Sequence, residues 1–336
     1  MSNFNKEFFD KGINRLNTNC EKWDVPIRKY GENLLAMWVA DMDFETVPSI
    51  ETKLSERVSH NTYGYTEISE EDHEAFYNFM QRRHGIRISK NENQMLPCVV
   101  TGIKTCVRCF SNEHDAIVIQ SPVYGPFSSS ISINNRKIID NALVKQRDNS
   151  YTIDFQLLEN QFKNGAKLII FCNPHNPVSK CWNEDELSQL VKLSKKYDVF
   201  IISDEIHADF VYKPNKFISV LSIAEKFNYN NVICLFSASK TFNIAGLQQA
   251  QLVTKNMELF DKIKKEVNSV GLTYGNIFAL AATREAYNNG DDWLNGLIKY
   301  LDEGRQILLE QLKEHLPKVK ISPIDATYLA WLDITA

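Results

Sequence analysis

The sequence predicts an α/β fold in which a mainly parallel sheet lies between two layers of helices. Four short runs are apolar nearly throughout, as expected of parallel strands that are covered on both faces. They span residues 116–120, 168–172, 199–203 and 232–236. Amphipathic segments separate them, and such alternation of strand and helix is typical of a three-layer α/β/α architecture.

The segments between these runs carry the apolar spacing and the end signals of helices. Residues 183–186 (NEDE) resemble a capping box, and an apolar face follows in the next turns. The same kind of spacing predicts helices over about 46–60, 70–84, 154–163 and 256–268.

The pattern changes near residue 275, where two helix-like segments (276–290 and 291–315) follow each other, before a strand-like run at 327–334. A chain of 336 residues is long enough for one large domain and a smaller one. We therefore predict three parts, which are an N-terminal segment (1–45), a large domain (46–275) and the start of a small α+β domain (276–336).

Composition argues against several classes of function. Lys and Arg number 38 and Asp and Glu number 42, so nothing in the formal net charge of −4 favours nucleic acid or an anionic membrane as a partner. No run of about 18 apolar residues predicts a membrane span, and the first residues lack the apolar region of a secretory signal. We expect a globular, cytoplasmic protein with neither kind of partner.

The seven cysteines show no spacing typical of a disulfide framework, so we expect reduced thiols. Cys106 and Cys109 form one CxxC, which has two interpretations. The pair is either a redox or metal-binding motif, or part of a buried helix face that also includes Ile103 and Phe110. Because the sequence holds no second CxxC, the buried face is favoured and we expect no metal site.

Polar and aromatic residues follow each of the four predicted strands. In strand order they are Tyr124, Asn176, Asp204 with His207, and Lys240. In an open α/β sheet, ligands bind beyond the carboxyl ends of the strands, so we expect these side chains to line one site. Each residue alone also has a purely structural explanation. Tyr124 could cover a core, Asn176 could belong to a turn, Asp204 could cap a helix and Lys240 could be a solvated charge in a loop. Together they suit pyridoxal 5′-phosphate (PLP).

The sequence offers each partner that PLP needs. Lys240 supplies an amine for a covalent bond to the cofactor's aldehyde, and Asp204 supplies a carboxylate that keeps the pyridine nitrogen protonated. Tyr124 is a flat partner for the ring, and Asn176 and His207 can hydrogen-bond to its phenolic oxygen.

The phosphate of PLP also needs donors. Residues 101–104 (TGIK) are predicted to open a helix, whose free N–H groups bind anions, and Ser237 and Ser239 can add hydroxyl donors.

Six motifs occur in an order that resembles one known family. They are MWVADMDF (37–44), YGYT (63–66), SPVYGPF (121–127), NPHNPV (173–178), SDEIHADFVY (203–212) and SKTFNIAGLQ (239–248). From about residue 20 to its end the chain resembles the fold-type-I aminotransferase superfamily, and more narrowly its cystathionine β-lyase (C–S lyase) branch. The resemblance implies a PLP-dependent lyase that cleaves cystathionine or a related sulfur amino acid to a thiol, pyruvate and ammonia.

The resemblance also implies roles for individual residues. Lys240, Asp204 and Tyr124 would be catalytic, with Lys240 removing the Cα proton, and His207 stands where the aminotransferase branch usually has tyrosine. Tyr65 would reach the phosphate from the other subunit of a homodimer. Positions that match the phosphate site are Gly102, Ile103 and Ser237, and positions that match the substrate pocket are Val39, Ala40 and Asp41.

Two features depart from the family pattern. Ser179 follows NPHNPV, where the family usually has glycine. Family members also continue for several tens of residues beyond ATYLAWLD (326–333), through the arginine that clamps the substrate carboxylate, so an incomplete small domain is expected. Two alternatives to the lyase therefore stay open, an aminotransferase and a catalytically impaired PLP-binding protein.

Overall fold

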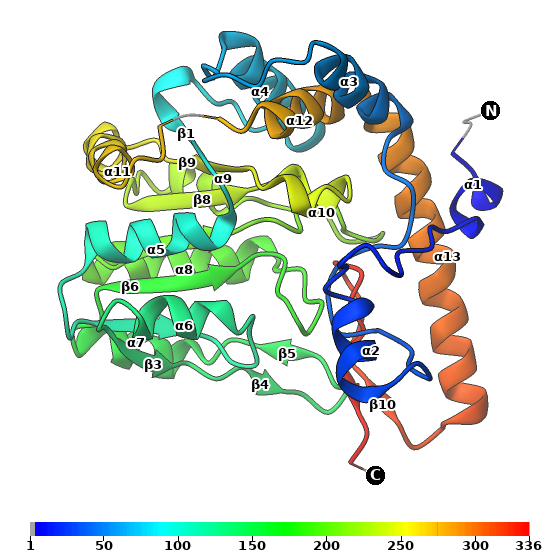
Figure 1. The fold of residues 1–336 in the computed structure, drawn as a ribbon. Coiled ribbons are helices and arrows are strands. Elements are labelled where there is room, and N and C mark those ends of the chain that lie inside the picture. The colour runs from blue at the N-terminus through cyan, green and yellow to red at the C-terminus, as the bar shows by residue number, and fades with distance from the viewer. Residues whose placement is uncertain (1–3, 274, 336) are drawn as a thin grey trace.

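The computed structural model describes residues 4–273 and 275–335, and a sheet of seven strands forms its centre (Figure 1). The strands β3, β2, β6, β7 and β8 run parallel to one another, whereas β9 is antiparallel to both β8 and β1. The predicted α/β fold with a mainly parallel sheet is confirmed. In spatial order the strands are β1 (Asn93–Leu96), β9 (Ala250–Val253), β8 (Val232–Phe236), β7 (Phe200–Asp204), β6 (Leu168–Cys172), β2 (Ala116–Ile119) and β3 (Lys137–Asp140).

The four predicted strands are β2, β6, β7 and β8, each within one residue of its expected bounds. The apolar pattern alone does not mark the other three. β3 is an exposed edge strand, and β1 and β9 carry polar residues that pair with each other. The Asn93 Nδ2 donates to Gln251 Oε1 at 3.0 Å, which pairs two buried side-chain amides inside the sheet.

Helices cover both faces of this sheet, and each face forms its own apolar core. Along β6, Ile169 and Phe171 join one core, while Leu168, Ile170 and Cys172 join the other, because successive strand residues point to opposite faces. The smaller core includes α5 (Val99–Phe110), α6 (Pro126–Ser132) and α11 (Met257–Ser269). The larger core includes α4 (Glu70–His84), α7 (Phe155–Lys163), α8 (Glu184–Tyr197) and α9 (Val220–Lys226).

The predicted helices are all present. α4, α7 and α11 lie within one residue of their expected bounds, α3 (Pro48–Ser59) lies within the expected 46–60, and the capping box of Asn183 and Glu186 begins α8. The helix start at Thr101 is wrong, because α5 begins two residues earlier with Cys98 as its N-cap. Two further short segments, η1 (Lys90–Glu92) and η2 (Ala245–Leu247), are 3₁₀ turns.

The CxxC belongs to the buried face of α5, as favoured. Cys106 is fully buried in the smaller core with Ile103 and Phe110, and Cys109 packs at its edge. Burial raises the pKa of the Cys106 thiol well above its ordinary value and that of Cys109 to about 11, so both thiols stay protonated at neutral pH. All seven cysteines lie in the described part of the chain and are free thiols.

Two helices follow residue 275, as predicted, and the N-terminal segment packs against the second of them. These helices are α12 (Ile277–Asn289) and α13 (Asp291–His315). Figure 1 shows α1 (Lys6–Asp10) beside α13, where the rings of Phe9 and Trp293 are 5.8 Å apart. The segment continues through α2 (Asp24–Tyr30).

The strand-like run at 327–334 forms much less strand than expected. Only β11 (Leu332–Asp333) pairs, with β10 (Lys320–Ile321), and a second small hairpin joins β4 (Val144–Lys145) to β5 (Tyr151–Thr152). The Thr327 N–H instead donates to the Phe210 carbonyl at 2.7 Å. In this run, hydrogen bonds to Ser179 and Phe210 take the place of strand pairing.

Ser179, the departure from the family pattern, takes part in the same contacts. Its φ of 58° is in the left-handed region that favours glycine. Its buried hydroxyl donates to the Leu329 carbonyl at 2.7 Å and lies 2.9 Å from Thr327 Oγ1. The serine therefore keeps the turn and links it to residues 327–329.

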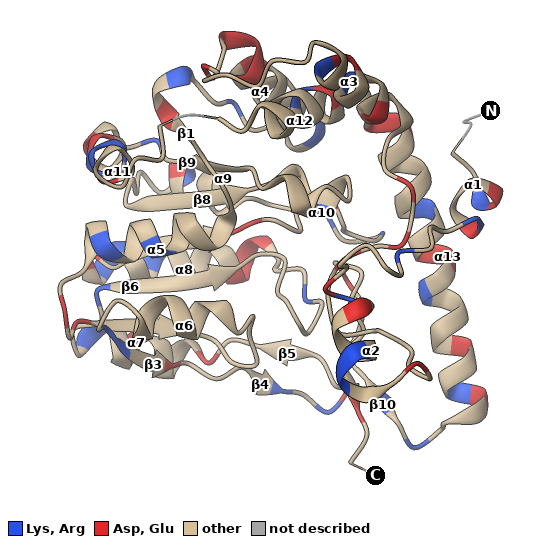
Figure 2. Ribbon diagram, in the orientation of Figure 1, with Lys and Arg blue, Asp and Glu red and all other residues tan. Residues whose placement is uncertain are grey.

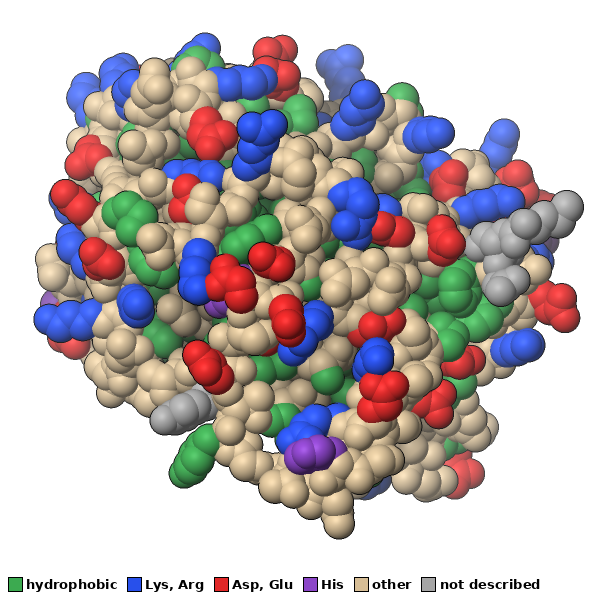
Figure 3. Space-filling model, turned by 90° about the horizontal axis from the view of Figure 1, so that it is seen from above, with side chains coloured by type: hydrophobic (Ala, Val, Ile, Leu, Met, Phe, Trp, Pro, Cys, Tyr) green, Lys and Arg blue, Asp and Glu red, His purple; other side chains and the backbone are tan. Residues whose placement is uncertain are grey.

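No helix within 4–273 and 275–335 is long and apolar enough to cross a membrane. Basic and acidic side chains are interspersed on the outer helices in Figure 2 and over the face seen in Figure 3. This distribution agrees with the nearly balanced charge of the sequence.

We predict opposite effects for alanine at two glycines of the α12–α13 region. A Cβ at Gly290 would overlap the Phe242 ring and lie 2.5 Å from the Ala286 carbonyl oxygen, so Gly290→Ala should lower the free energy of unfolding by about 1–3 kcal/mol. A Cβ at Gly304, an exposed position within α13, meets no atom within 4 Å, so Gly304→Ala should raise it by about 0.5–1 kcal/mol. Urea unfolding measures both changes in the free energy of unfolding. If the two substitutions changed it equally, the packing described at Gly290 would be contradicted.

Candidate functional site

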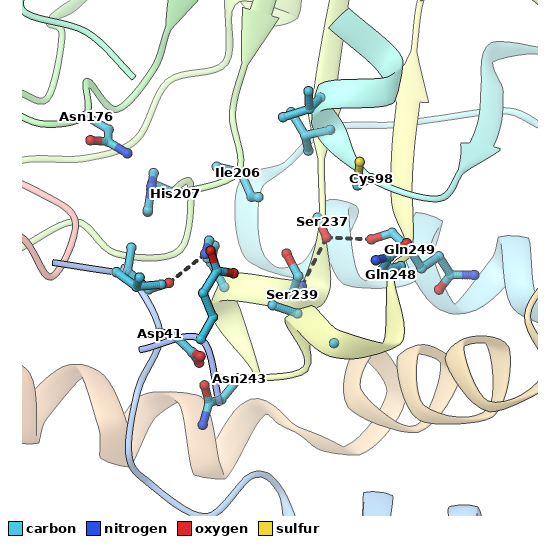
Figure 4. A pocket seen from close by; sticks show the side chains of 18 of the residues that line it. Asp41, Cys98, Asn176, Ile206, His207, Ser237, Ser239, Asn243, Gln248 and Gln249 are labelled. Atoms are coloured by element: carbon cyan, nitrogen blue, oxygen red, sulfur yellow. Dashed lines mark hydrogen bonds between the residues drawn. The ribbon is translucent and has the colours of Figure 1, made fainter. Parts of the chain in front are cut away.

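A cavity of about 930 Å³ opens at the carboxyl ends of the parallel strands (Figure 4). Side chains that follow β2, β6, β7 and β8 line it, together with the first residues of α5 and part of the N-terminal segment. The structure brings together ten of the residues singled out from the sequence. They are Val39, Ala40, Asp41, Tyr124, Asn176, Asp204, His207, Ser237, Ser239 and Lys240.

Lys240 lies in α10 (Ala238–Thr241), the single helical turn that follows β8. Its Nζ donates to the Ala40 carbonyl at 2.6 Å. Burial lowers the pKa of this amine, although the charges of Asp41 and Asp204 act in the opposite direction. A lysine whose pKa is lowered is a better nucleophile and base at neutral pH than an exposed one.

Asp204 is the last residue of β7 and is only 3% exposed. Burial raises the pKa of its carboxyl to about 7; the Ile206 N–H, 3.2 Å from Oδ1, and the Lys240 charge oppose the rise. A buried carboxylate with so few donors is well placed to bind a cationic group of a ligand.

His207 and Asn176 lie on the same side of the cavity (Figure 4). Burial lowers the pKa of His207 to about 3, so the imidazole is neutral at physiological pH. Within the described part of the chain its buried Nδ1 has no hydrogen-bond partner. Because buried polar atoms are almost always paired, this nitrogen is available to a ligand. The imidazole and the Asn176 amide are both suited to a phenolic oxygen.

Tyr124 offers a flat apolar face at the cavity. It is 40% exposed, and its ring stands edge-on to Phe127 with the centroids 6.1 Å apart. Burial of the remaining surface raises the pKa of the phenol, so Tyr124 is uncharged at neutral pH.

The first turn of α5 and the turn before α10 form the end of the cavity suited to an anion. Val99 and Val100 line it and begin α5, so their N–H groups have no partner within the helix. The Ser237 hydroxyl donates to the Gln249 carbonyl at 2.6 Å and accepts from the Ser239 N–H at 3.1 Å (Figure 4). Hydroxyl and amide groups are thus concentrated at this end.

Gly102 and Ile103, by contrast, do not reach the cavity. They lie one turn inside α5, where the Gly102 N–H donates to the Cys98 carbonyl at 3.2 Å and Ile103 is fully buried. A Cβ at Gly102 would lie 2.6 Å from Leu235 Cδ2, so this glycine lets α5 approach β8. The residues of α5 that do line the cavity are Val99 and Val100, which begin the helix.

Sequence reasoning missed several residues that line the cavity, namely Arg15, Cys98, Val99, Val100, Gln248 and Gln249. Pro97 stands directly before the N-cap Cys98, and because proline commonly marks a break between elements, it is the signal that could have placed the start of α5 earlier. Gln248 is the last residue of the SKTFNIAGLQ motif (239–248), and Gln249 follows it directly.

Tyr65, the residue expected to serve a second subunit, is 94% exposed and does not line this cavity. It stands in the irregular segment between α3 and α4. Its predicted contact requires another chain.

Ion pairs and hydrogen bonds hold residues 39–44 over the site. Arg15 Nη2 is 2.7 Å from Asp41 Oδ2, and Lys22 Nζ is 2.7 Å from Asp43 Oδ2. The Asn243 amide, three residues after Lys240, donates to the carbonyls of Met42 and Phe44 at 3.0 and 2.9 Å. The Ala40 carbonyl that accepts from Lys240 is therefore fixed on both sides.

Comparison with known proteins agrees with this geometry. Residues 33–336 match the model of the aminotransferase class I and II family. The chain is 37% identical to cystathionine β-lyase PatB of Bacillus subtilis, over 98% of this chain and 85% of that protein, and 30% identical to protein MalY of Escherichia coli, over 97% and 83%. Among solved structures, the PLP-bound C–S lyase of Staphylococcus hominis superposes with a TM-score of 0.90 at 33% identity, covering 97% of this chain and 82% of that one.

We predict that Asp204 makes the stability of the chain fall as the pH rises. Its folded pKa is raised from 3.8 to about 7, so the folded chain retains a proton that the unfolded chain loses, and this contribution is lost between these two values. The free energy of unfolding of Asp204→Asn, measured relative to wild type, should rise by about 2–4 kcal/mol as the pH goes from about 4.5 to about 8. Urea unfolding without added cofactor measures it.

The comparison of two chains is needed because buried histidines act in the opposite direction. Burial lowers the pKa of His175 to about 4 and that of His207 to about 3, so both destabilise the folded chain at low pH. They do so in wild type and variant alike, and the difference isolates Asp204. If the free energies of unfolding of wild type and Asp204→Asn changed with pH in the same way, the raised pKa of Asp204 would be contradicted.

Proposed function

The chain belongs to the aminotransferase class I and II family, and we propose that it is a PLP-dependent lyase that cleaves the C–S bond of cystathionine or a related sulfur amino acid. The products are a thiol, pyruvate and ammonia. The observation that carries the proposal is that Lys240 and the buried Asp204 line one cavity at the strand ends. Relatives named cystathionine β-lyase, and C–S lyases with PLP bound, support the same reaction.

The burial and the hydrogen bonding of the cavity residues fit PLP. Asp204 is buried and short of donors, which suits a protonated pyridine nitrogen, and the unpartnered His207 Nδ1 suits the neighbouring phenolic oxygen together with Asn176. Tyr124 offers a face for the ring. Phosphate donors are the N–H groups that begin α5 and the Ser239 hydroxyl, because the single O–H of Ser237 already donates to the Gln249 carbonyl.

When bound, PLP supplies an electron sink that makes the Cα proton of an amino acid removable. Lys240 acts as the general base that takes this proton, and its lowered pKa favours the neutral amine that the role requires. Asp204 supports the sink by holding a positive charge at the ring nitrogen. Tyr124 would stack on the cofactor ring and hold it in place.

Residues 39–41 form the wall that the substrate meets. The Ala40 carbonyl, 2.6 Å from Lys240 Nζ, fixes the direction of the amine, while Asp41 supports the charged form of Lys240. Because Arg15 holds Asp41 at 2.7 Å, this wall is rigid without its own secondary structure. A rigid wall keeps the Cα proton in line with Lys240 and excludes water.

We predict that the purified chain releases pyruvate from L-cystathionine when PLP is present, without a 2-oxo acid. Lys240→Ala removes the general base and should lower the rate by about 10²–10⁴-fold. Lys196→Ala is the matched control, because Lys196 is exposed on α8 and pairs only at the surface with Glu159. Pyruvate is measured with lactate dehydrogenase.

The same assay separates the alternatives. Amino-group transfer that requires a 2-oxo acid, with no pyruvate in its absence, would identify an aminotransferase that shares the cofactor contacts. Bound PLP without any product would identify an impaired PLP-binding protein. Full turnover by the Lys240→Ala variant would rule out the proposed base.

We also propose a homodimer in which Tyr65 serves the partner's phosphate site. Tyr65 is 94% exposed, and Leu35 and Met37 are 78% and 82% exposed; large apolar side chains left uncovered in the single chain support an interface with a second one. We likewise propose that the chain is divided into its three parts at residues 45 and 275, and that the protein is cytoplasmic.

The dimer proposal predicts a particle of about twice 38.7 kDa in sedimentation equilibrium. Tyr65→Phe removes one hydrogen bond to a charged group, so the Kd for PLP should rise by about 10-fold or more. A monomeric wild-type chain, with the same Kd for PLP as Tyr65→Phe, would contradict a phosphate site shared between two subunits.

A further inference from the structure

Asp209 lies behind the cavity, in the loop that follows β7, and faces the helical turn that carries Lys240. Its side chain is only 7% exposed, and it does not line the cavity. It belongs to the SDEIHAD motif, in which Asp204 and His207 already have proposed roles. A buried carboxylate beside the catalytic turn therefore remains to be explained.

Three side chains from two other elements converge on Asp209. The Thr241 hydroxyl donates to Oδ2 at 2.7 Å, and His84 Nε2 lies 2.9 Å from Oδ1. Arg83 Nε is 3.5 Å from Oδ1. Burial alone raises the pKa of a carboxyl, but His84, Arg83 and Thr241 outweigh it and hold the pKa of Asp209 below its ordinary value. The group is an anion anchored on the C-terminal end of α4.

The turn that carries Lys240 depends on such anchors. α10 has four residues, and one helical turn is too short to be stable by itself. Thr241 follows Lys240 directly and is 1% exposed, so its hydroxyl must be paired inside the protein. The Asp209 carboxylate is that partner, and it gives this turn a charged hydrogen-bond acceptor.

We propose that Asp209, held by His84 and Arg83, is a positioning residue that fixes the direction of Lys240 through Thr241. The proposal rests on the proposed function of Lys240. Asp209 touches neither substrate nor cofactor; it sets the rotation of α10, and with it the point in the cavity that the amine reaches. A displacement of about 1 Å in a catalytic group can lower a rate by about 100-fold.

Three variants of the PLP-loaded protein test this. Thr241→Val keeps the shape of the side chain but removes the hydroxyl, Asp209→Asn removes the charge, and Thr241→Ser restores the hydroxyl. Asp72→Asn is the matched control. Asp72 is likewise buried and bound to an arginine and a hydroxyl, at 2.9 Å from Arg284 Nε and 2.8 Å from Ser69 Oγ, but at the opposite end of α4.

Two readouts distinguish positioning from stability. We expect Thr241→Val and Asp209→Asn to lower kcat for pyruvate release by about 10–100-fold with KM changed by less than about 3-fold. The second readout uses no substrate. Borohydride reduction traps PLP on Lys240, and mass spectrometry at limiting PLP should find the trapped fraction lowered by about 5-fold or more.

Thr241→Ser should restore both readouts, and Asp72→Asn should lower the Tm while leaving both unchanged. The proposal is overturned if Thr241→Val loses stability as Asp72→Asn does but keeps kcat and the trapped fraction of wild type. If Asp209→Asn does not fold, the two Thr241 variants decide. If wild type releases no pyruvate, the proposed function fails, and the trapped fraction still decides the role of Thr241.

Discussion

The buried carboxyl of Asp204 is the constraint on which the rest of the site depends. Its backbone is paired on both sides, with Cys172 of β6 and Leu235 of β8, so the side chain cannot move toward water. Few donors face it, and burial holds its pKa at about 7. A charge in such a place is unfavourable until a cation meets it. Strand order thus creates a site suited to a ligand that carries a cationic group.

The structure around Asp204 contributes to the site in two ways. It places the amine of Lys240 within the same cavity, on a turn held by Asp209 on one side and by Asn243 on the other. It also closes the mouth with residues 39–44, which ion pairs from Arg15 and Lys22 fasten in place. Rigid contacts of this kind keep reacting groups aligned, which is where much of the rate of an enzyme originates.

Much of this could be predicted from the sequence, because buried parallel strands have a clear signature. The strands β2, β6, β7 and β8 are almost wholly apolar, and the polar residues directly after them converge by topology alone. Knowing that Asp204 directly follows one predicted strand and that Lys240 follows the next one was enough to predict that the two side chains lie in the same site.

Other features depend on contacts between distant segments and carry no local signal. The ion pair between Arg15 and Asp41, and the hydrogen bonds of Asn243 to the carbonyls of Met42 and Phe44, join residues whose pairing no periodicity reveals. The expected strand at 327–334 is mostly absent because Ser179 and Phe210 bind its backbone. The start of α5 was misplaced because Cys98 has none of the usual side-chain capping signals.

A crystal structure of the chain with PLP tests the central claim most directly. The account predicts electron density continuous from Lys240 Nζ to the cofactor, the ring nitrogen within hydrogen-bonding distance of Asp204, and the phosphate against the N–H groups that begin α5. A cofactor bound with its phosphate at Asn176 and His207, or away from Asp204, would contradict it.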